Sequence, residues 1–204
     1  MRRPSSRKAA KALAQPIYFP PENVLHRVLP PELEGTRDFE QFHFIGFDWS
    51  GADLSGWRLS ECRFENCNLA GVTLANTSLQ NVAFAGCKLL GLPFNACRDL
   101  LFDVHFDRCQ LDYASFWGKG MPNTRFVGCS LREADFTRTD LTNAVFDECE
   151  LPGAVFSQTR LPGADLRTAR HLVLDPEQNE LKKARFALAG LPGLLGKYGL
   201  EVSW

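Results

Sequence analysis

The sequence predicts an all-β solenoid with four sides, because a large apolar residue returns at every fifth position over most of the chain. The sites are positions 39, 44, 49 and so on to 94, then 101, 106, 111 and so on to 171, and all but the last hold Phe, Leu, Trp or Met. A mostly small residue, such as Ala52, Cys67 or Thr139, stands two positions before each site. A period of five fits neither a helix nor a flat strand, but it suits a chain that turns a corner every five residues and stacks coil on coil.

A second period of twenty residues distinguishes the four sides. The first side holds Phe44, Phe64, Phe84, Phe106, Phe126, Phe146 and Leu166, and the second holds Trp49, Leu69, Leu89, Leu111, Leu131 and Leu151. The third side holds Leu54, Leu74, Phe94, Phe116, Phe136 and Phe156, and the fourth holds Leu59, Leu79, Leu101, Met121, Leu141 and Leu161. Coils about 4.8 Å apart, the spacing of neighbouring strands in a sheet, would place these like residues over one another.

Composition sets limits on the class of protein. A chain of 204 residues with 45% hydrophobic residues fits one domain with a continuous core. Its formal net charge is −1, with +3 on residues 1–35 and −4 on residues 36–171, so no bulk attraction to nucleic acid or to an acidic membrane is expected. No apolar run approaches the length of about 18 residues that spans a bilayer, and no secretory signal is recognisable near the start.

The first 38 residues are predicted to be a basic arm followed by a cap. Residues 1–16 contain five basic and no acidic residues, which is typical of a solvated arm. An organelle transit peptide has a similar composition, but no other feature supports that alternative. Residues 17–38 are rich in Pro, and residues 24–29 suit a short strand over the open first coil, which needs a cap. The first coil is predicted to contain an aromatic plug formed by Phe39, Phe42, Phe44, Phe47 and Trp49.

Five of the seven cysteines stand at the small position of one side, twenty or twenty-two residues apart. They are Cys67, Cys87, Cys109, Cys129 and Cys149. This spacing is the coil repeat and not the short spacing of zinc or redox sites. Sulfurs about 4.8 Å apart are also too distant for a disulfide of about 2.05 Å. We therefore expect a ladder of buried free thiols without metal or cofactor, which favours a reducing, cytoplasmic location.

The five-residue count is broken once, between Cys97 and Phe106. Two extra residues, within 98–101, fall on the fourth side, and one coil later residues 118–123 place Lys119 where a small buried residue belongs. An unpaired ammonium inside the core is costly, so we expect Lys119 to bulge outward. The two defects are either a local kink or a binding feature, because irregular loops on a rigid scaffold often carry function.

Residues 172–204 form a tail with a different pattern. Asp175 as N-cap and Pro176 at the first helical position predict an α-helix over residues 175–189, ended by Gly190. A second short helix is expected over 192–197, and residues 200–204 alternate like a strand. The tail has more apolar residues than a lone cap needs, which predicts a two-fold contact with a second copy. The predicted dimer interface comprises Leu181, Phe186, Leu188, Leu191, Leu194, Leu195, Tyr198, Leu200 and Val202.

Segments such as Ala52-Asp53-Leu54 and Ala134-Asp135-Phe136 resemble the motif of the pentapeptide-repeat family, a small residue followed two positions later by Leu or Phe. The resemblance covers residues 39–171 and implies a right-handed, four-sided β-helix. The tail, with Asp175-Pro176, Asn179 and the run from Leu181 to Phe186, is similar to the ends of albicidin-resistance and microcin B17-immunity proteins. Those proteins are related in role to the plasmid quinolone-resistance proteins.

The resemblance implies a homodimer joined head to head through its tail. Such a dimer would act on DNA gyrase, with topoisomerase IV as an open second target, and protect it from poisons that trap the cleaved complex. A rod that imitates DNA should carry acidic residues at phosphate-like spacing. The candidate contacts with the partner are Asp103, Asp107, Asp112, Lys119, Met121, Asp147, Glu148 and Glu150. Arg63, Arg108, Arg125 and Arg132 are interspersed among them, so a solvated surface of mixed charge is the alternative reading.

Catalysis is not expected. His26, His43, His105 and His171 lie in no Ser-His-Asp, Cys-His or metal-ligand motif. His171 occupies the last large-residue site and is expected to face the tail. Two classes of binding protein therefore remain. One is a topoisomerase-binding resistance or self-immunity factor, and the other is a scaffold whose partner is unrelated to topoisomerases.

Overall fold

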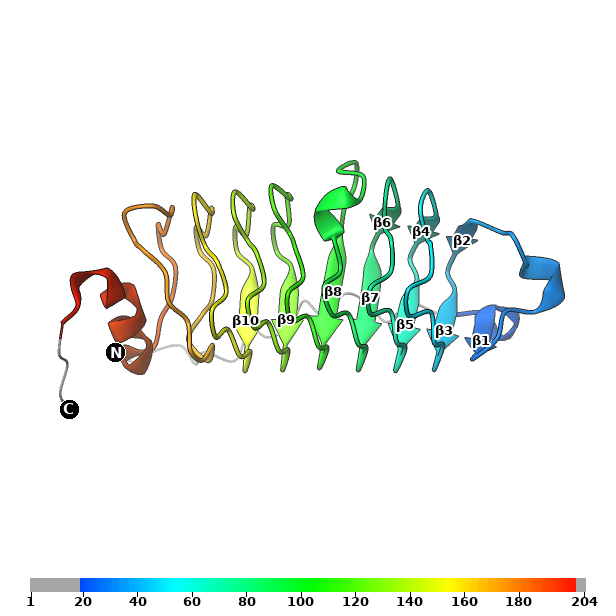
Figure 1. The fold of residues 1–204 in the computed structure, drawn as a ribbon, viewed down its shortest axis with the longest axis horizontal. Coiled ribbons are helices and arrows are strands. Elements are labelled where there is room, and N and C mark those ends of the chain that lie inside the picture. Colours follow the sequence, from blue (N-terminus) through cyan, green and yellow to red (C-terminus); the bar gives the residue numbers. More distant parts are fainter. Residues whose placement is uncertain (1–18, 201–204) are drawn as a thin grey trace, which may run out of the picture.

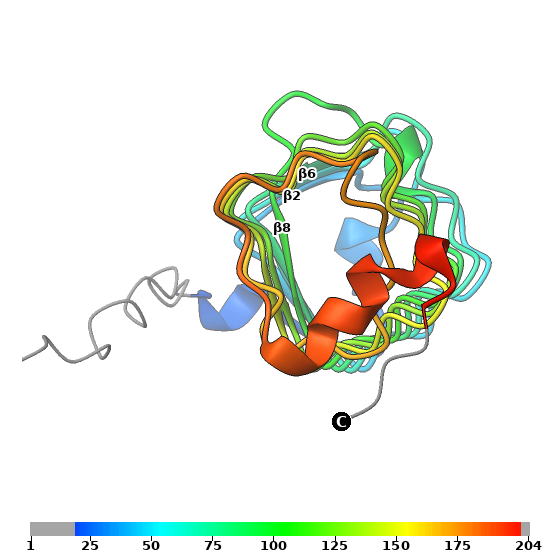
Figure 2. The same ribbon diagram turned by 90° about the vertical axis from the view of Figure 1, so that its left-hand side faces the viewer.

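A computed structural model describes residues 19–200 as a tube of stacked coils (Figure 1). Viewed along the tube, successive coils follow nearly the same outline, and the chain advances by one coil every twenty residues over most of its length (Figure 2). The predicted four-sided β-solenoid is confirmed. The predicted basic arm lies outside the described residues.

Strands mark two of the four sides. The first side carries one parallel sheet, formed in order by β1 (Val24–His26), β3 (His43–Ile45), β5 (Arg63–Glu65), β7 (Val82–Ala85), β8 (Val104–Asp107), β9 (Arg125–Val127) and β10 (Val145–Asp147). The fourth side carries a second parallel sheet of β2 (Asp38–Glu40), β4 (Arg58–Ser60) and β6 (Ser78–Gln80). Isolated parallel bridges, such as those between Asp48 and Asn68 and between Asp53 and Thr73, join coils on the other two sides. Strands stay short because a corner follows every five residues.

The predicted columns of like residues are stacked as expected. Phe44 pairs in register with Phe64, and Phe106 with Phe126. Rings on the first side stack at centroid distances of 4.8 to 5.5 Å. Rings of the opposite first and third sides meet edge to face in the core, as Phe116 and Phe126 do at 5.9 Å. Such pairs add about 0.5–1.5 kcal/mol each beyond the burial of their area, so a continuous aromatic stack is a large part of what stabilises the tube.

The corners require backbone that most residues avoid. At the corner after the first side, Gly46, Asn66, Gly86, Arg108, Gly128 and Glu148 all have left-handed φ angles between 51° and 68°. Glycine adopts this region without strain, and Asn tolerates it better than most residues. Recurrent Gly and Asn at the pentad ends therefore follow from the geometry of the turn.

The N-terminal end is closed as predicted. The short 3₁₀ helices η2 (Pro21–Asn23) and η3 (Pro31–Leu33) flank β1, which pairs with β3 and covers the first coil. Beneath it, Phe39 meets Phe42 and Phe44 edge to face, and Trp49 packs against Phe47 at 4.6 Å. The predicted aromatic plug is confirmed.

The predicted α-helix over residues 175–189 is wrong, because the coil continues through that segment. Parallel bridges join Arg160 to Glu180 and Asp165 to Arg185. The Asp175 side chain accepts a hydrogen bond from the backbone N–H of Glu177, which closes a turn and does not start a helix. The twenty-residue offsets from Leu161 to 181 and from Leu166 to 186 are the sequence signal for this extra coil.

After this last coil come two 3₁₀ helices, η5 (Leu188–Leu194) and η6 (Gly196–Tyr198). Within residues 19–200, no helix is long and apolar enough to cross a membrane. Ion pairs from Lys197 to Asp175 (2.8 Å) and Glu177 (2.6 Å) fasten the tail to the coil. Gly193 lies so close to the last coil that an added Cβ would clash with the Leu172 carbonyl oxygen. The two short helices therefore form a cap that lies directly on the open end.

Candidate interaction site

In the irregular coil, the residue predicted to fill the core on the fourth side is wrong. Leu101, which the five-residue count assigns to the core, is 67% exposed, and the neighbouring Phe102 is buried in its place. Leu100 is 74% exposed. Residues 98–101, which we call the leucine loop, leave the outline of the tube and are visible as the green bulge in Figures 1 and 2.

The extra residues are not simply inserted. The step from Cys97 to Phe102 is five positions long, whereas the equivalent step in the preceding coil, from 77 to 79, is two positions long. Only two positions then separate Phe102 from Val104, where three separate 79 from 82. Three residues are therefore added before Phe102 and one is lost after it, which together account for the two extra residues in the sequence.

Lys119 contradicts the expectation that it bulges outward. Its side chain is only 2% exposed, and its ammonium donates to the Cys97 carbonyl at 2.5 Å and to the Asp99 carboxylate at 2.6 Å. The Phe102 ring lies 5.2 Å from Nζ. A buried charge is tolerated when it is paired and hydrogen-bonded, and here the partners come from the coil before it. Lys119 thus holds the leucine loop at its N-terminal half, through the residue before the loop and a side chain within it.

The residue lost after Phe102 leaves a gap in one corner of the tube. Gln41, Glu61, Asn81, Asn123 and Asn143 occupy this corner in other coils, all with left-handed φ. In the irregular coil no residue fills the position, and a cavity of about 510 Å³ opens there. We call this cavity the notch. Its lining residues are Ser60, Glu61, Gln80, Asn81, Leu101, Phe102, Asp103, His105, Pro122 and Asn123.

The notch interrupts a row of backbone hydrogen bonds. The corner N–H of Gln41 donates to Ser60, that of Glu61 to Gln80, and that of Asn123 to the coil beyond. The N–H of Asn81 has no such partner among residues 19–200, because the carbonyl of Asp103, which stands in the acceptor's place, accepts from the N–H of Val82 instead. An unused donor therefore lies on the wall of the notch.

Of the eight predicted partner-binding residues, two are not available at the surface. Met121 is buried, as Lys119 is, so both are wrong as contacts with a partner. Asp103 is the one candidate that lines the notch, where its carboxylate lies 3.6 Å from the His105 ring. The remaining five acids lie elsewhere on the tube and mostly contact their own coil or the next one.

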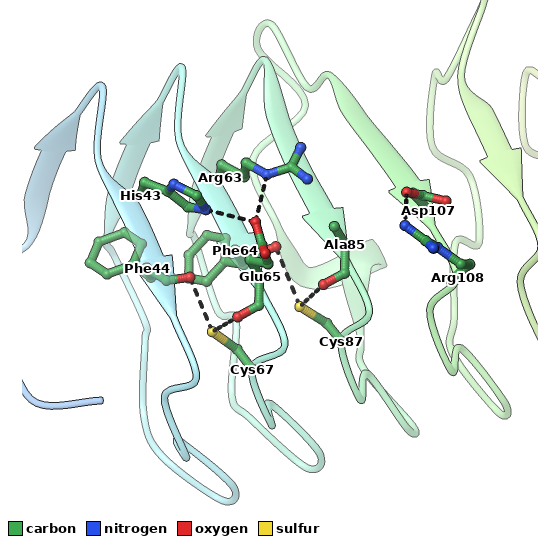
Figure 3. Close-up of polar contacts among 10 residues, drawn as sticks. All are labelled: His43, Phe44, Arg63, Phe64, Glu65, Cys67, Ala85, Cys87, Asp107 and Arg108. Carbon is green, nitrogen blue, oxygen red and sulfur yellow. Dashed lines mark hydrogen bonds and ion pairs between the residues drawn. The ribbon is translucent and has the colours of Figure 1, made fainter. Parts of the chain in front are cut away.

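Figure 3 shows the first side with part of its charge pattern. Glu65 accepts from His43 at 3.1 Å and from Arg63 at 3.4 Å, and Asp107 pairs with Arg108 at 3.1 Å. Burial lowers the pKa of His43, although Glu65 opposes this shift. The negative charge of Glu65 and Asp107 is thus partly neutralised by neighbouring basic side chains.

The other predicted acids serve contacts between coils. Asp112 accepts from the Ser130 hydroxyl, and Asp147 from the Thr168 hydroxyl at 2.9 Å. Glu150 pairs with Arg170 at 3.3 Å and lies 3.4 Å from the exposed His171, which does not face the core as a large residue would. Glu148 occupies a corner with left-handed φ. Signs also alternate on the fourth side, where Arg160 bridges the acids at 140 and 180.

The cysteine ladder is confirmed as free and buried. All seven cysteines are unpaired, and the Cys67 and Cys87 sulfurs lie near the carbonyl oxygens of Phe44 and Phe64 on the preceding coil (Figure 3). Burial raises the pKa of the Cys97 thiol to about 12. Within residues 19–200, no group of His, Cys, Asp and Glu side chains is placed to hold a metal. The thiols are therefore packing residues.

The C-terminal end exposes apolar residues. Leu188, Leu191, Leu195, Tyr198 and Leu200 of the predicted dimer interface are exposed, and Val173 of the last coil lies in the same region. Leu181, Phe186 and Leu194 are instead partly buried against the core, so they act as the cap. Val202 lies outside the described residues.

Sequence profiles of the pentapeptide repeat match most of the tube. A profile described as "Pentapeptide repeat region" matches residues 57–119, and one described as "Pentapeptide repeats (8 copies)" matches 121–147 and 129–167. No curated protein sequence matches this chain significantly.

Three solved structures illustrate the range of likeness to this chain, and the first of them has a similar fold. A trypsin-treated variant of QnrB1, a plasmid-mediated fluoroquinolone resistance protein, is 16% identical with a TM-score of 0.59, over 88% of this chain and 96% of that one. A second trypsin-treated QnrB1 variant is 19% identical with a TM-score of 0.47, over 89% and 98%. HetL, a pentapeptide repeat protein involved in heterocyst differentiation regulation from the cyanobacterium Nostoc sp. strain PCC 7120, is 18% identical with a TM-score of 0.28, over 78% and 92%.

Proposed function

This chain belongs to the pentapeptide-repeat family, and on that premise we propose that it is a non-catalytic protein that binds DNA gyrase and protects it from poisons. The observation that carries the proposal is the likeness to the fluoroquinolone resistance protein QnrB1, which extends over nearly the whole length of both chains. A resistance protein of this kind would act by occupying a surface of its target, and a rigid tube with a fixed outline suits that role.

We propose that two copies join through their C-terminal ends. The exposed apolar residues of η5 and η6 lie beside the last coil, where a second copy would cover them and extend the rod. A two-fold contact of this type uses the same patch on both copies. Charged replacements at the exposed Leu188 and Leu195 are expected to give monomers in light scattering. The same replacements should leave the melting temperature nearly unchanged, because neither side chain is buried.

DNA imitation makes a separate prediction about the surface charge of the tube. The tube alternates positive and negative side chains from coil to coil, so long-range attraction to a basic enzyme groove is modest. Affinity for gyrase would then depend on local contacts. Reversing the charge of Asp107 and Asp147 tests this point. Unchanged protection after reversal shows that those acids are bystanders, whereas lost protection supports imitation of the phosphate backbone.

The experiment that tests the function is a gyrase supercoiling and cleavage assay with purified full-length chain. Quinolone, albicidin-like and peptide poisons are added in separate arms, with topoisomerase IV as a second enzyme. The proposal predicts restored supercoiling and fewer cleaved complexes in at least one arm. It is contradicted if the chain neither restores supercoiling nor binds gyrase at micromolar concentration.

The alternative is a scaffold whose partner is unrelated to topoisomerases. The mixed charge of the tube favours it, because nothing in that pattern is specific to an enzyme that binds DNA. Failure of the gyrase assay together with capture of a different, identified partner would support this alternative.

A further inference from the structure

We propose that the notch and the leucine loop together form a docking site for a segment of the partner protein that presents a Lys or Arg side chain next to an apolar one. The inference rests on the proposed function, since it assigns that segment to gyrase. It goes further by naming the contact surface and the chemistry that the surface selects.

The lining of the notch is complementary to a basic side chain. Among the described residues it contains the carboxylates of Glu61 and Asp103, with the His105 ring 3.6 Å from the latter, and no Lys or Arg. The amides of Gln80, Asn81 and Asn123 offer further carbonyl oxygens. A guanidinium carries several N–H donors in a planar fork, so it could use carboxylate and amide acceptors together. A cavity of about 510 Å³ has room for such a side chain.

The same cavity also suits a peptide backbone. The N–H of Asn81 lacks a backbone acceptor because, with the next corner residue missing, the Asp103 carbonyl accepts from Val82. A carbonyl from a bound protein segment would supply that acceptor, while its basic side chain meets the carboxylates. Duplex DNA would instead bring phosphates toward Glu61 and Asp103, which repel them. The lining therefore favours a protein partner over nucleic acid.

The leucine loop supplies the apolar half of the site. Leu100 and Leu101 are adjacent and both mostly exposed, and Leu101 also lines the notch. Covering two exposed leucines with a partner is favourable, because it removes their apolar surface from water. Their position at the rim places an apolar contact directly beside the acidic one.

Lys119 holds this arrangement in place. Its ammonium binds the Cys97 carbonyl and the Asp99 carboxylate, so it fastens the part of the chain that leads into the two leucines. A loop fixed in this way loses less conformational entropy on binding than a free one. We assign Lys119 as a positioning residue, since it is buried and does not reach the partner itself.

The test measures binding of the full-length chain to gyrase holoenzyme together with protection in the supercoiling assay. The double variant Glu61→Lys with Asp103→Lys should weaken binding by about tenfold or more and reduce its dependence on salt, because it removes charge complementarity. The matched control is Asp48→Lys with Asp53→Lys, two acids on the second and third sides, and it should bind as the wild type does.

A second pair of variants tests the apolar half. Leu100→Ser with Leu101→Ser should also weaken binding and protection, whereas Val155→Ser, an exposed apolar residue on the third side, should not. Both leucines are exposed, so the melting temperature should stay within a few degrees of wild type. A third variant inserts one Asn between Asp103 and Val104, which restores the missing corner and should fill the notch.

The outcomes separate the two proposals. A wild-type chain that neither binds nor protects gyrase overturns both the function and the docking site. A wild-type chain that does both, with notch and loop variants indistinguishable from it, overturns the docking site alone. Tight binding of the wild type to a 20-base-pair duplex in place of gyrase would overturn the assignment of a protein segment.

Discussion

Threonine and lysine occupy the same buried position on the fourth side in different coils, and the difference between them separates the regular coils from the irregular region. At Thr77, Thr139 and Thr159, the hydroxyl donates to a carbonyl of the preceding coil at 2.8 Å. At Lys119 a longer side chain does the same at 2.5 Å and also reaches Asp99. The backbone at Lys119 remains regular, since its N–H donates to Phe116 as in other coils.

The comparison teaches that the solenoid accommodates the added residues by pairing a buried carbonyl with a longer donor, while the corner beside them loses the hydrogen bond of the Asn81 N–H. A threonine suffices where the coil is tight, because the carbonyl lies directly in reach. Where three residues are added the space beneath the loop is larger, and a lysine spans it. The regular coils therefore provide stiffness, and the irregular coil provides a shape that no regular coil has.

The largest expected effect comes from breaking the regular stack. Phe126→Ala removes a fully buried ring that stacks on Phe106 and Phe146, and it should cost about 3–5 kcal/mol of unfolding free energy. Phe102→Ala in the irregular coil should cost less, because that ring is slightly exposed and stacks on no other ring among the described residues. Urea denaturation measures both. Equal losses would show that the irregular coil is packed as tightly as the others.

Lys119→Met should have an intermediate effect. It leaves the Cys97 carbonyl buried without its donor, which costs about 1–3 kcal/mol. It also releases the leucine loop, so limited proteolysis within residues 98–101 should accelerate. Lys182→Met is the matched control on an exposed lysine, and its cost should stay within about 0.5 kcal/mol. Unchanged proteolysis of the loop would contradict the role of Lys119.

Thr139→Val probes the regular version of the same contact. The replacement keeps the side-chain shape but removes the hydroxyl that donates to the Phe116 carbonyl, so it should cost roughly 1–2 kcal/mol. No loop should be released, since none is present in that coil. Thermal unfolding measures the loss, and a proteolysis pattern identical to wild type completes the comparison with Lys119→Met.

The smallest effect concerns pH. The hydrogen bonds and charge of Arg167 hold the pKa of Asp165 below its usual range, with a further contribution from Arg185. A lowered folded-state pKa means that this stabilisation is present above the unfolded value of about 3.9 and is lost as the pH falls through the folded value. Asp165→Asn should therefore flatten the fall in melting temperature below about pH 4. An unchanged acid limb would show that this pair adds nothing.

The regular part of the fold could be predicted from the sequence because each pentad repeats the same physical requirement. Each side needs one large and one small buried side chain, and this requirement is visible in the sequence as a five-residue period. Phe126, Leu131 and Phe136 could therefore be assigned to the core without a structure. The free cysteine ladder followed from the same count. Because the five-residue pattern repeats, the assignment of each site supports the assignment of the next one.

The irregular coil could not be predicted, since its determinants are not local. An arrangement with Leu101 in the core and Phe102 at the surface would use the same number of residues as the observed one, so the residue count cannot distinguish them. Only the packing of the side chains decides between the two. The burial of Lys119 depends on a carbonyl and a carboxylate about twenty residues earlier in the chain. The Asp175-Pro176 pair begins a helix in many proteins, but here the twenty-residue period extends past it and forms another coil.

The most direct test of this account is amine acetylation of the native chain, followed by mass spectrometry of each lysine. Lys119 should stay unmodified while Lys88, Lys182 and Lys183 react, because its ammonium is buried and bound at both the Cys97 carbonyl and Asp99. It should become reactive once the chain is unfolded in urea. If native Lys119 is acetylated as fast as Lys182, its ammonium lies in solvent. That result would contradict both the role of Lys119 in holding the leucine loop and the docking site that includes this loop.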